Sequence, residues 1–143
     1  MRKLILFFAA LFVVSSCSME DDTPQFHVEF VPIESVEMPE SFTIGNSYDI
    51  KVWYKRPSDC HFFEGFYYEE DGTTLTVAAQ TLVIEDATCE SLENEPAESA
   101  VFTFVCSPTY DNTTSYHFKF FTGDQGGQLG QDSYLEFEVP VLQ

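Results

Sequence analysis

Apolar and polar side chains alternate by twos along most of the chain beyond residue 25. In the first such run, Phe26, Val28 and Phe30 alternate with His27 and Glu29. Alternation with this period is typical of β-strands that bury one face, and no sustained helical period interrupts it. An all-β fold is therefore predicted. The same alternation recurs over residues 48–55, 74–79, 101–105, 116–121 and 134–141.

Turn-forming residues separate these runs and divide the chain into short strands. Asp71-Gly72 favours a hairpin between the strand-like runs on either side of it. The run 62–68 is aromatic on both faces, which predicts a central strand of a sandwich. About seven short strands in a chain of this size are typical of an immunoglobulin-like antiparallel β-sandwich. Residues 26–143 are predicted to form that single domain, with a barrel or a jelly roll as the alternative.

One segment favours the immunoglobulin-like prediction. The run Asn112-Thr113-Thr114-Ser115-Tyr116-His117-Phe118 resembles the tyrosine corner at the start of strand F in immunoglobulin domains. The resemblance implies that Phe118 stands where antibody domains place their second cysteine. The usual cysteine–tryptophan pairing is missing from the sequence, so the resemblance concerns the strand pattern alone.

The start of the chain has the pattern of an export signal. Residues 4–14 form an unbroken apolar run of eleven residues after Arg2 and Lys3. A run of this length is too short to span a bilayer, which takes about 20 residues, and fits the core of a signal peptide. The following Val14-Ser15-Ser16-Cys17 resembles the lipobox of bacterial lipoproteins. The resemblance implies that residues 1–16 are removed and that Cys17 is lipidated; the alternative is an ordinary secretory signal.

Acidic residues follow this cysteine at once. The run Cys17-Ser18-Met19-Glu20-Asp21-Asp22 resembles the acidic tract after the lipidated cysteine of surface-exposed lipoproteins of the Bacteroidota. The resemblance implies a protein anchored by lipid in the outer membrane and displayed on the cell surface, with residues 17–25 as an acidic tether. The alternative for the acids is a solvated tether without an export role.

The charge balance excludes one class of partner. Beyond residue 16 the chain has four basic residues against 24 acidic ones, a formal charge of −20. Such a chain repels phosphate backbones, so nucleic acid is excluded as a partner. Aromatic residues make up 16% of the chain, which gives it enough apolar area for a core and argues against disorder.

The order in which strands cross the sandwich predicts the disulfide. With Cys17 lipidated, three cysteines remain, and the strand before Cys60 and the strand before Cys89 both end at the same end of the sandwich. The next strand carries Cys106 to the opposite end, about 20 Å away. Because a disulfide needs Cα atoms within about 7 Å, a Cys60–Cys89 bridge is predicted, with Cys106 as a buried thiol.

The sequence predicts neither a metal nor a cofactor. Cys60-His61, Cys89, Cys106 and His117 offer zinc-binding atoms but lack the close paired spacing of zinc sites. The Gly-rich run from Asp124 to Asp132 resembles one calcium-binding β-roll repeat with an extra residue. That architecture depends on stacked repeats, so a flexible loop is favoured over a calcium site.

Catalytic motifs are also missing from the sequence. It contains no Gly-x-Ser-x-Gly, no His-Glu-x-x-His and no phosphate-binding glycine loop. The chain is predicted not to be an enzyme. A hydrolase that uses two of the many carboxylates is the alternative.

A binding or accessory role remains. The crossing order gathers three loops at the end where the first strand begins, namely 57–60, 85–99 and 122–133. Clustered loops of a sandwich are where this fold carries recognition surfaces, and this acidic end suits a basic protein partner or a cation. Because the tether attaches at the same end, a protein partner in or near the same membrane is predicted. The alternatives are a solvated loop without a partner and a structural envelope component without a specific ligand. The candidate binding residues of these loops are Glu90, Glu93, Glu95, Glu98, Asp124 and Asp132.

Overall fold

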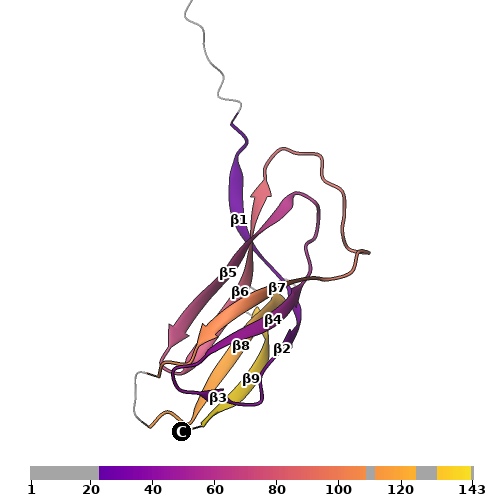
Figure 1. Ribbon diagram of the computed structural model, residues 1–143. Helices are drawn as coiled ribbons and strands as arrows, with labels where there is room; N and C mark the ends of the chain where they lie inside the picture. Colours follow the sequence, from indigo (N-terminus) through magenta and orange to yellow (C-terminus); the bar gives the residue numbers. More distant parts are fainter. Residues whose placement is uncertain (1–22, 109–111, 125–131, 143) are drawn as a thin grey trace, which may run out of the picture.

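The computed structural model (Figure 1) describes residues 23–108, 112–124 and 132–142. Strands make up 67% of the described residues, which contain no helix. The prediction of an all-β fold is confirmed. The predicted signal peptide, Cys17 and most of the predicted tether lie outside the described residues. In the described part no helix has the length and apolarity that would let it cross a membrane.

The described part of the chain has nine strands where about seven were predicted. The two that the pattern missed are short segments within residues 33–43, and a register shift between Ile33 and Ser35 breaks the alternation there. The strands are β1 (Phe26–Val31), β2 (Ile33–Glu37), β3 (Phe42–Thr43), β4 (Ser47–Tyr54), β5 (His61–Asp71), β6 (Thr74–Ile84), β7 (Glu98–Val105), β8 (Ser115–Asp124) and β9 (Asp132–Leu142).

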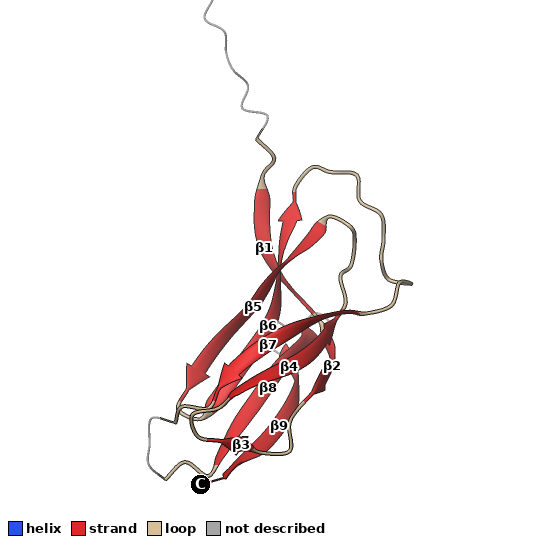
Figure 2. Cartoon of the chain, viewed as in Figure 1, coloured by secondary structure: helices blue, strands red, loops and turns tan. Residues whose placement is uncertain are grey.

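The strands form two sheets, as a β-sandwich requires (Figure 2). The larger sheet has the order β1-β6-β8-β9-β3, with β5 paired to β6 as well, and the smaller sheet has the order β2-β4-β7. The buried side chains of both sheets form one aromatic-rich core. Phe42 and Phe118 are completely buried, and the ring of Phe104 lies 4.8 Å from that of Phe42 and 5.1 Å from that of Phe118.

The prediction that all strands pair antiparallel is wrong at two places. β6 pairs parallel with β8, from Thr74↔His117 to Val77↔Phe120, and the short β3 pairs parallel with β9. Local alternation shows where a strand lies but not its direction relative to a distant neighbour, since parallel pairs arise only when the chain crosses over between them. The hairpin predicted at Asp71-Gly72 is confirmed, because β5 and β6 pair from Asp71↔Thr74 onward.

The prediction that residues 62–68 form a central strand is also wrong. β5 pairs with β6 alone and is an edge strand. A bulge between Phe63 and Gly65 shifts its register, and Gly65 has a φ of 138°, a conformation that favours glycine. As a result Phe63 packs against the core, whereas Phe62 and Tyr67 lie on the opposite face and are 45% and 43% exposed.

One edge of β6 serves two partners in turn. Its first half pairs with β8 as far as Val77, and its second half pairs antiparallel with β1 from Ala79 to Ile84. Beyond that change the three strands β1, β6 and β5 continue as a ribbon past the two stacked sheets (Figure 1). We call this ribbon with its loops, residues 25–30, 57–63 and 80–97, the arm, and the two-sheet part the body.

Candidate functional site

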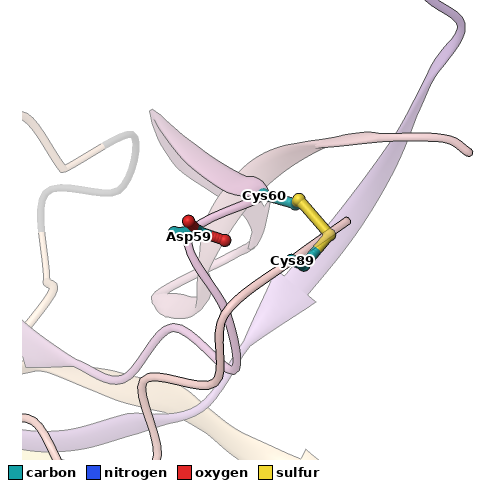
Figure 3. Close-up of side chains that lie close together, drawn as sticks. All are labelled: Asp59, Cys60 and Cys89. Carbon is teal, nitrogen blue, oxygen red and sulfur yellow. A yellow bond between two sulfur atoms is a disulfide. The ribbon is translucent and has the colours of Figure 1, made fainter. Parts of the chain in front are cut away.

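The end of the arm is closed by a disulfide (Figure 3). Cys60 and Cys89 are bonded, with their Cα atoms 5.6 Å apart, and Cys106 is a buried free thiol at the far end of β7. The predicted bridge is confirmed, as is the predicted state of Cys106. Burial raises the pKa of the Cys106 thiol. This thiol is therefore a poor nucleophile, and we assign it to core packing.

Backbone hydrogen bonds join the same two loops around the disulfide. The amide of Asp59 donates to the carbonyl of Glu90, whose own amide donates to the Asp59 carboxylate at 2.8 Å. The amide of Leu92 donates to the carbonyl of Pro57 at 2.9 Å. The loops 57–60 and 85–97 thus form one fixed unit rather than two independent recognition loops.

The acidic residues predicted to bind a partner have different surroundings. Glu90, Glu93 and Glu95 have exposed side chains on the long loop. Glu98 instead begins β7 and forms an ion pair with Arg56, whose Nε lies 2.8 Å from the Glu98 carboxylate. The guanidinium also donates to the carbonyl of His61 at 2.6 Å. Glu98 therefore stabilises the junction between arm and body, and its charge is compensated.

A further trio of potential metal ligands lies at the disulfide. Ligand atoms of Asp59, Cys60 and Cys89 are within 4.8 Å of one another (Figure 3). Zinc binds cysteine as thiolate, and these two sulfur atoms are bonded to each other. Only the Asp59 carboxylate remains as a metal ligand, so this trio is not a metal site while the disulfide is intact.

A groove lies on the outer face of the larger sheet, the face that points away from the smaller sheet. It has a volume of about 600 Å³, and Thr76 and Ala78 of β6 contribute to its lining. Aromatic side chains from four strands also line it, because the outward positions of these strands are aromatic where β6 has small residues. They are Phe30 of β1, Tyr67 of β5, Phe121 of β8 and Tyr134 of β9.

The rings of the groove contact one another as a cluster. Phe30 stacks on Tyr67 with ring centroids 5.4 Å apart, and Phe121 lies 6.4 Å from Phe30 and 6.3 Å from Tyr134. Aromatic pairs at these distances support one another. The four rings thus form a continuous apolar lining that is open to solvent along the outer face.

Carboxylates border this lining and engage its tyrosines. The Tyr67 hydroxyl donates to Glu69 at 2.7 Å, and this bond is the main cause that raises the pKa of Tyr67. The Tyr134 hydroxyl donates to Asp132 at 3.2 Å; burial first, and then this bond, raises the pKa of Tyr134. Both hydroxyls therefore remain neutral donors at physiological pH, and the groove is apolar inside and acidic at its border.

The described ends of the Gly-rich segment do not lie at the acidic loop, where the segment was predicted to be. Asp132 lies at the groove beside Ala78, whereas the acidic loop begins after Ile84, six residues further along β6 and about 20 Å away. The reason is that β1 replaces β8 on β6, so the pairing of β8 with β6 ends at Val77, halfway along β6. Asp124 pairs with Asp132 in that hairpin, and residues 125–131 lie outside the described residues.

The groove residues Phe30, Tyr134 and Ala78 were not among the predicted site residues. The alternation of β1 does place Phe26, Val28 and Phe30 on one face. From the sequence this face would be assigned to the core, and nothing local shows that no second sheet covers it.

Comparisons with known proteins add no relative. No protein-family model matches the chain, and no match was found among curated proteins or among solved structures. The residues and their geometry therefore carry the functional argument.

Proposed function

We propose that this chain is a lipid-anchored, surface-exposed outer-membrane lipoprotein that acts as a non-catalytic binding module. Its outer-face groove would bind a basic segment of a protein partner in or near the same membrane. We further propose that its sandwich is immunoglobulin-like, with Tyr116 and Phe118 in the core positions that the tyrosine-corner resemblance implies. The observation that carries the proposal is the aromatic groove with its acidic border.

Exposed apolar side chains in and beside the groove support a docking surface. Val28 and Phe30 of β1 are 55% and 40% exposed, and Phe62 and Tyr67 of β5 are 45% and 43% exposed. Strand register places all four on the outer face, since Val28 and Phe62 both pair with Leu82 and Tyr67 pairs with Ala78. Contiguous apolar patches on soluble proteins often mark interaction sites.

Charge supports a basic occupant. Glu69 and Asp132 border the groove, and the chain beyond residue 16 has a formal charge of −20. The chain already has one cation–π contact at the groove, since Lys119 Nζ lies 4.6 Å from the centroid of the Tyr134 ring. An ammonium or guanidinium group of a partner would gain the same cation–π attraction together with a carboxylate neighbour.

The proposed anchor fits a partner in the same membrane. β1 begins at Phe26, which pairs with Ile84 at the end of the arm. Phe26 is nine positions after Cys17, a reach of at most about 30 Å. A lipid on Cys17 would therefore hold the arm within that distance of the bilayer.

The test compares two neighbouring tyrosines of β5 in intact cells. Tyr67 and Tyr68 are both about half exposed, but Tyr67 lines the groove whereas Tyr68 lies on the other face, 5.7 Å from the Phe102 ring. Cross-linking followed by pull-down should recover about tenfold less partner with Tyr67→Ala, a typical loss for an aromatic anchor. Tyr68→Ala should recover as much as the wild type, and the captured segment should be rich in Lys and Arg.

Two results would contradict the proposal. Equal recovery with Tyr67→Ala and Tyr68→Ala would exclude the groove as the docking surface. Equal recovery with wild type and Cys17→Ala would exclude a partner that the membrane anchor brings near.

Glu69→Gln should weaken capture and make it less sensitive to salt, because it removes a border charge and leaves the rings in place.

A further inference from the structure

The inner face of the arm, opposite the groove, carries two histidines around one carboxylate. His27 of β1 and His61 of β5 both pair with Val83 of β6, from its two sides, so their side chains point to the same face. Glu29 follows two residues after His27 and therefore shares this face. Three potential ligands from two strands thus converge over the central strand of the arm.

The distances around Glu29 match those of a metal site. Its Oε2 lies 3.4 Å from Nε2 of His61 and 3.6 Å from Nε2 of His27. Ligand atoms bound to a tetrahedral zinc ion at about 2.0–2.1 Å are about 3.3–3.4 Å from one another. The two distances from Glu29 to the histidines are therefore close to those between the ligand atoms of a bound zinc ion.

Each imidazole has a second polar group at its other ring nitrogen. Nδ1 of His61 lies 2.8 Å from the Ser58 hydroxyl, and Nδ1 of His27 lies 3.2 Å from Oε1 of Glu85. Such partners at the non-ligating nitrogen orient the ring and leave the other nitrogen free for a metal. Glu85 also adds a second negative charge to the site.

From this arrangement we propose that His27, Glu29 and His61 form a Zn²⁺ site, with Ser58 and Glu85 as orienting partners. Nitrogen and carboxylate ligands in this combination suit zinc, and three protein ligands leave a fourth position for water. Arg56 is the nearby positive group, since it donates to the His61 carbonyl, but Glu98 takes up its charge.

Binding requires one side chain to move. The ligand atoms of His27, Glu29 and His61 do not all lie within 4.8 Å of one another. Among the described residues, only the ligand atoms of the trio at the disulfide lie that close together. The side chain of His61 is 10% exposed and fixed, whereas that of His27 is 50% exposed. His27 is therefore expected to swing toward His61 around the Glu29 carboxylate, and the ion would enter from its open side.

The competing explanation is that Glu29 only forms ion pairs with two protonated imidazoles. The chain offers a matched control for this, because Nε2 of His117 on β8 lies 3.1 Å from Oε2 of Glu136, its diagonal neighbour on β9, so that one histidine contacts one carboxylate. His117→Ala removes such a pair and leaves the proposed site unchanged.

The experiment is zinc titration of the purified, EDTA-treated full chain by calorimetry, at about 0.15 M salt to screen weak binding by the many surface acids. We expect one saturable Zn²⁺ site per chain. His27→Ala and Glu29→Gln should each lower its affinity by more than the roughly 10–100-fold typical of a second-shell partner, and Glu85→Gln by an amount within that range. His117→Ala should bind zinc as the wild type does.

A second measurement does not depend on the folding of variants. In the wild-type chain, one equivalent of Zn²⁺ should shift the imidazole ring resonances of His27 and His61 and leave those of His117 in place. Failure to saturate, equal affinity of His27→Ala and wild type, or equal shifts of all three histidines would overturn the proposal. These results do not test the groove, which Glu29 also lines; the groove is tested separately with Tyr67 and Tyr68, which take no part in the proposed zinc site.

Discussion

The body and the arm share β5 and β6 but are stabilised differently. In the body, β6 is covered by the smaller sheet, and Leu75, Val77 and Ala79 belong to the main core. In the arm the same strand has no facing sheet, and the buried residues there are outside that core: Cys60, His61, Thr81 and Val83. The comparison shows that a strand pattern predicts one apolar face without showing what covers it.

A disulfide and polar contacts stabilise the arm, which has no facing sheet. It has the disulfide, the ion pair of Arg56 with Glu98, and the Thr81 hydroxyl that donates to the Glu29 carbonyl at 2.9 Å. These links hold the ribbon without covering its outer face. The exposed apolar groove and the converging histidines both lie where the body's packing ends.

The largest expected difference between body and arm is the loss of stability when a buried side chain is truncated. Phe118→Ala should lower the free energy of unfolding by about 3–5 kcal/mol, because it opens a cavity in the completely buried centre of the body. Val83→Ala in the arm should cost only about 1–2 kcal/mol, since it removes fewer methyl groups at a less enclosed position. Urea unfolding followed by tryptophan fluorescence measures both. Equal losses would show that the arm is packed as tightly as the body.

Removal of the disulfide should weaken the arm most. The bridge closes a loop of 29 residues, so Cys60→Ala with Cys89→Ala should lower the free energy of unfolding by about 3 kcal/mol in the chain-entropy model. Hydrogen exchange should accelerate in loops 57–60 and 85–97 while the amides of β4 and β8 stay protected. Similar acceleration in β4 and β8 would mean that arm and body unfold as one unit.

A smaller effect is expected at the junction of arm and body. Arg56→Gln removes the ion pair with Glu98 and a bond to the His61 carbonyl, and should cost about 1 kcal/mol because both side chains are partly exposed. Lys51→Gln is the control, since Lys51 is an exposed body residue over the Trp53 ring. A loss at Lys51 as large as that at Arg56 would argue against a special role of the junction.

The smallest expected effect is a loss of stability at alkaline pH. Burial, and next to it the charge of Glu98, raises the pKa of Tyr54 above its usual value of 10.0, and burial raises that of Tyr116. Because the unfolded chain then loses these protons first, their contribution is complete below pH 10 and is lost as the pH rises through the folded-state values. The melting temperature should fall above pH 10, and less so in Tyr54→Phe. If the melting temperature of Tyr54→Phe falls as much as that of the wild type, other groups cause the loss of stability.

Local information accounts for what could be predicted. Period-two alternation located most strands, Asp71-Gly72 located a hairpin, and the count of crossings placed Cys60 and Cys89 together and Cys106 away from them. Each of these follows from residues close in the chain or from the parity of strand crossings. The predicted binding residues were less well placed, because Glu98 is paired with Arg56 and Asp132 lies at the groove.

The sequence by itself determined that this chain forms strands, where most of them turn, and which cysteines can meet, because side-chain alternation and chain length act locally. Only the tertiary structure decided that β1 replaces β8 along β6, which leaves one face of the ribbon uncovered. The same exchange brings His27 within reach of His61, 34 positions later in the chain, around one carboxylate. Pairing between distant strands depends on which surfaces bury best together, and no short stretch of sequence contains that information.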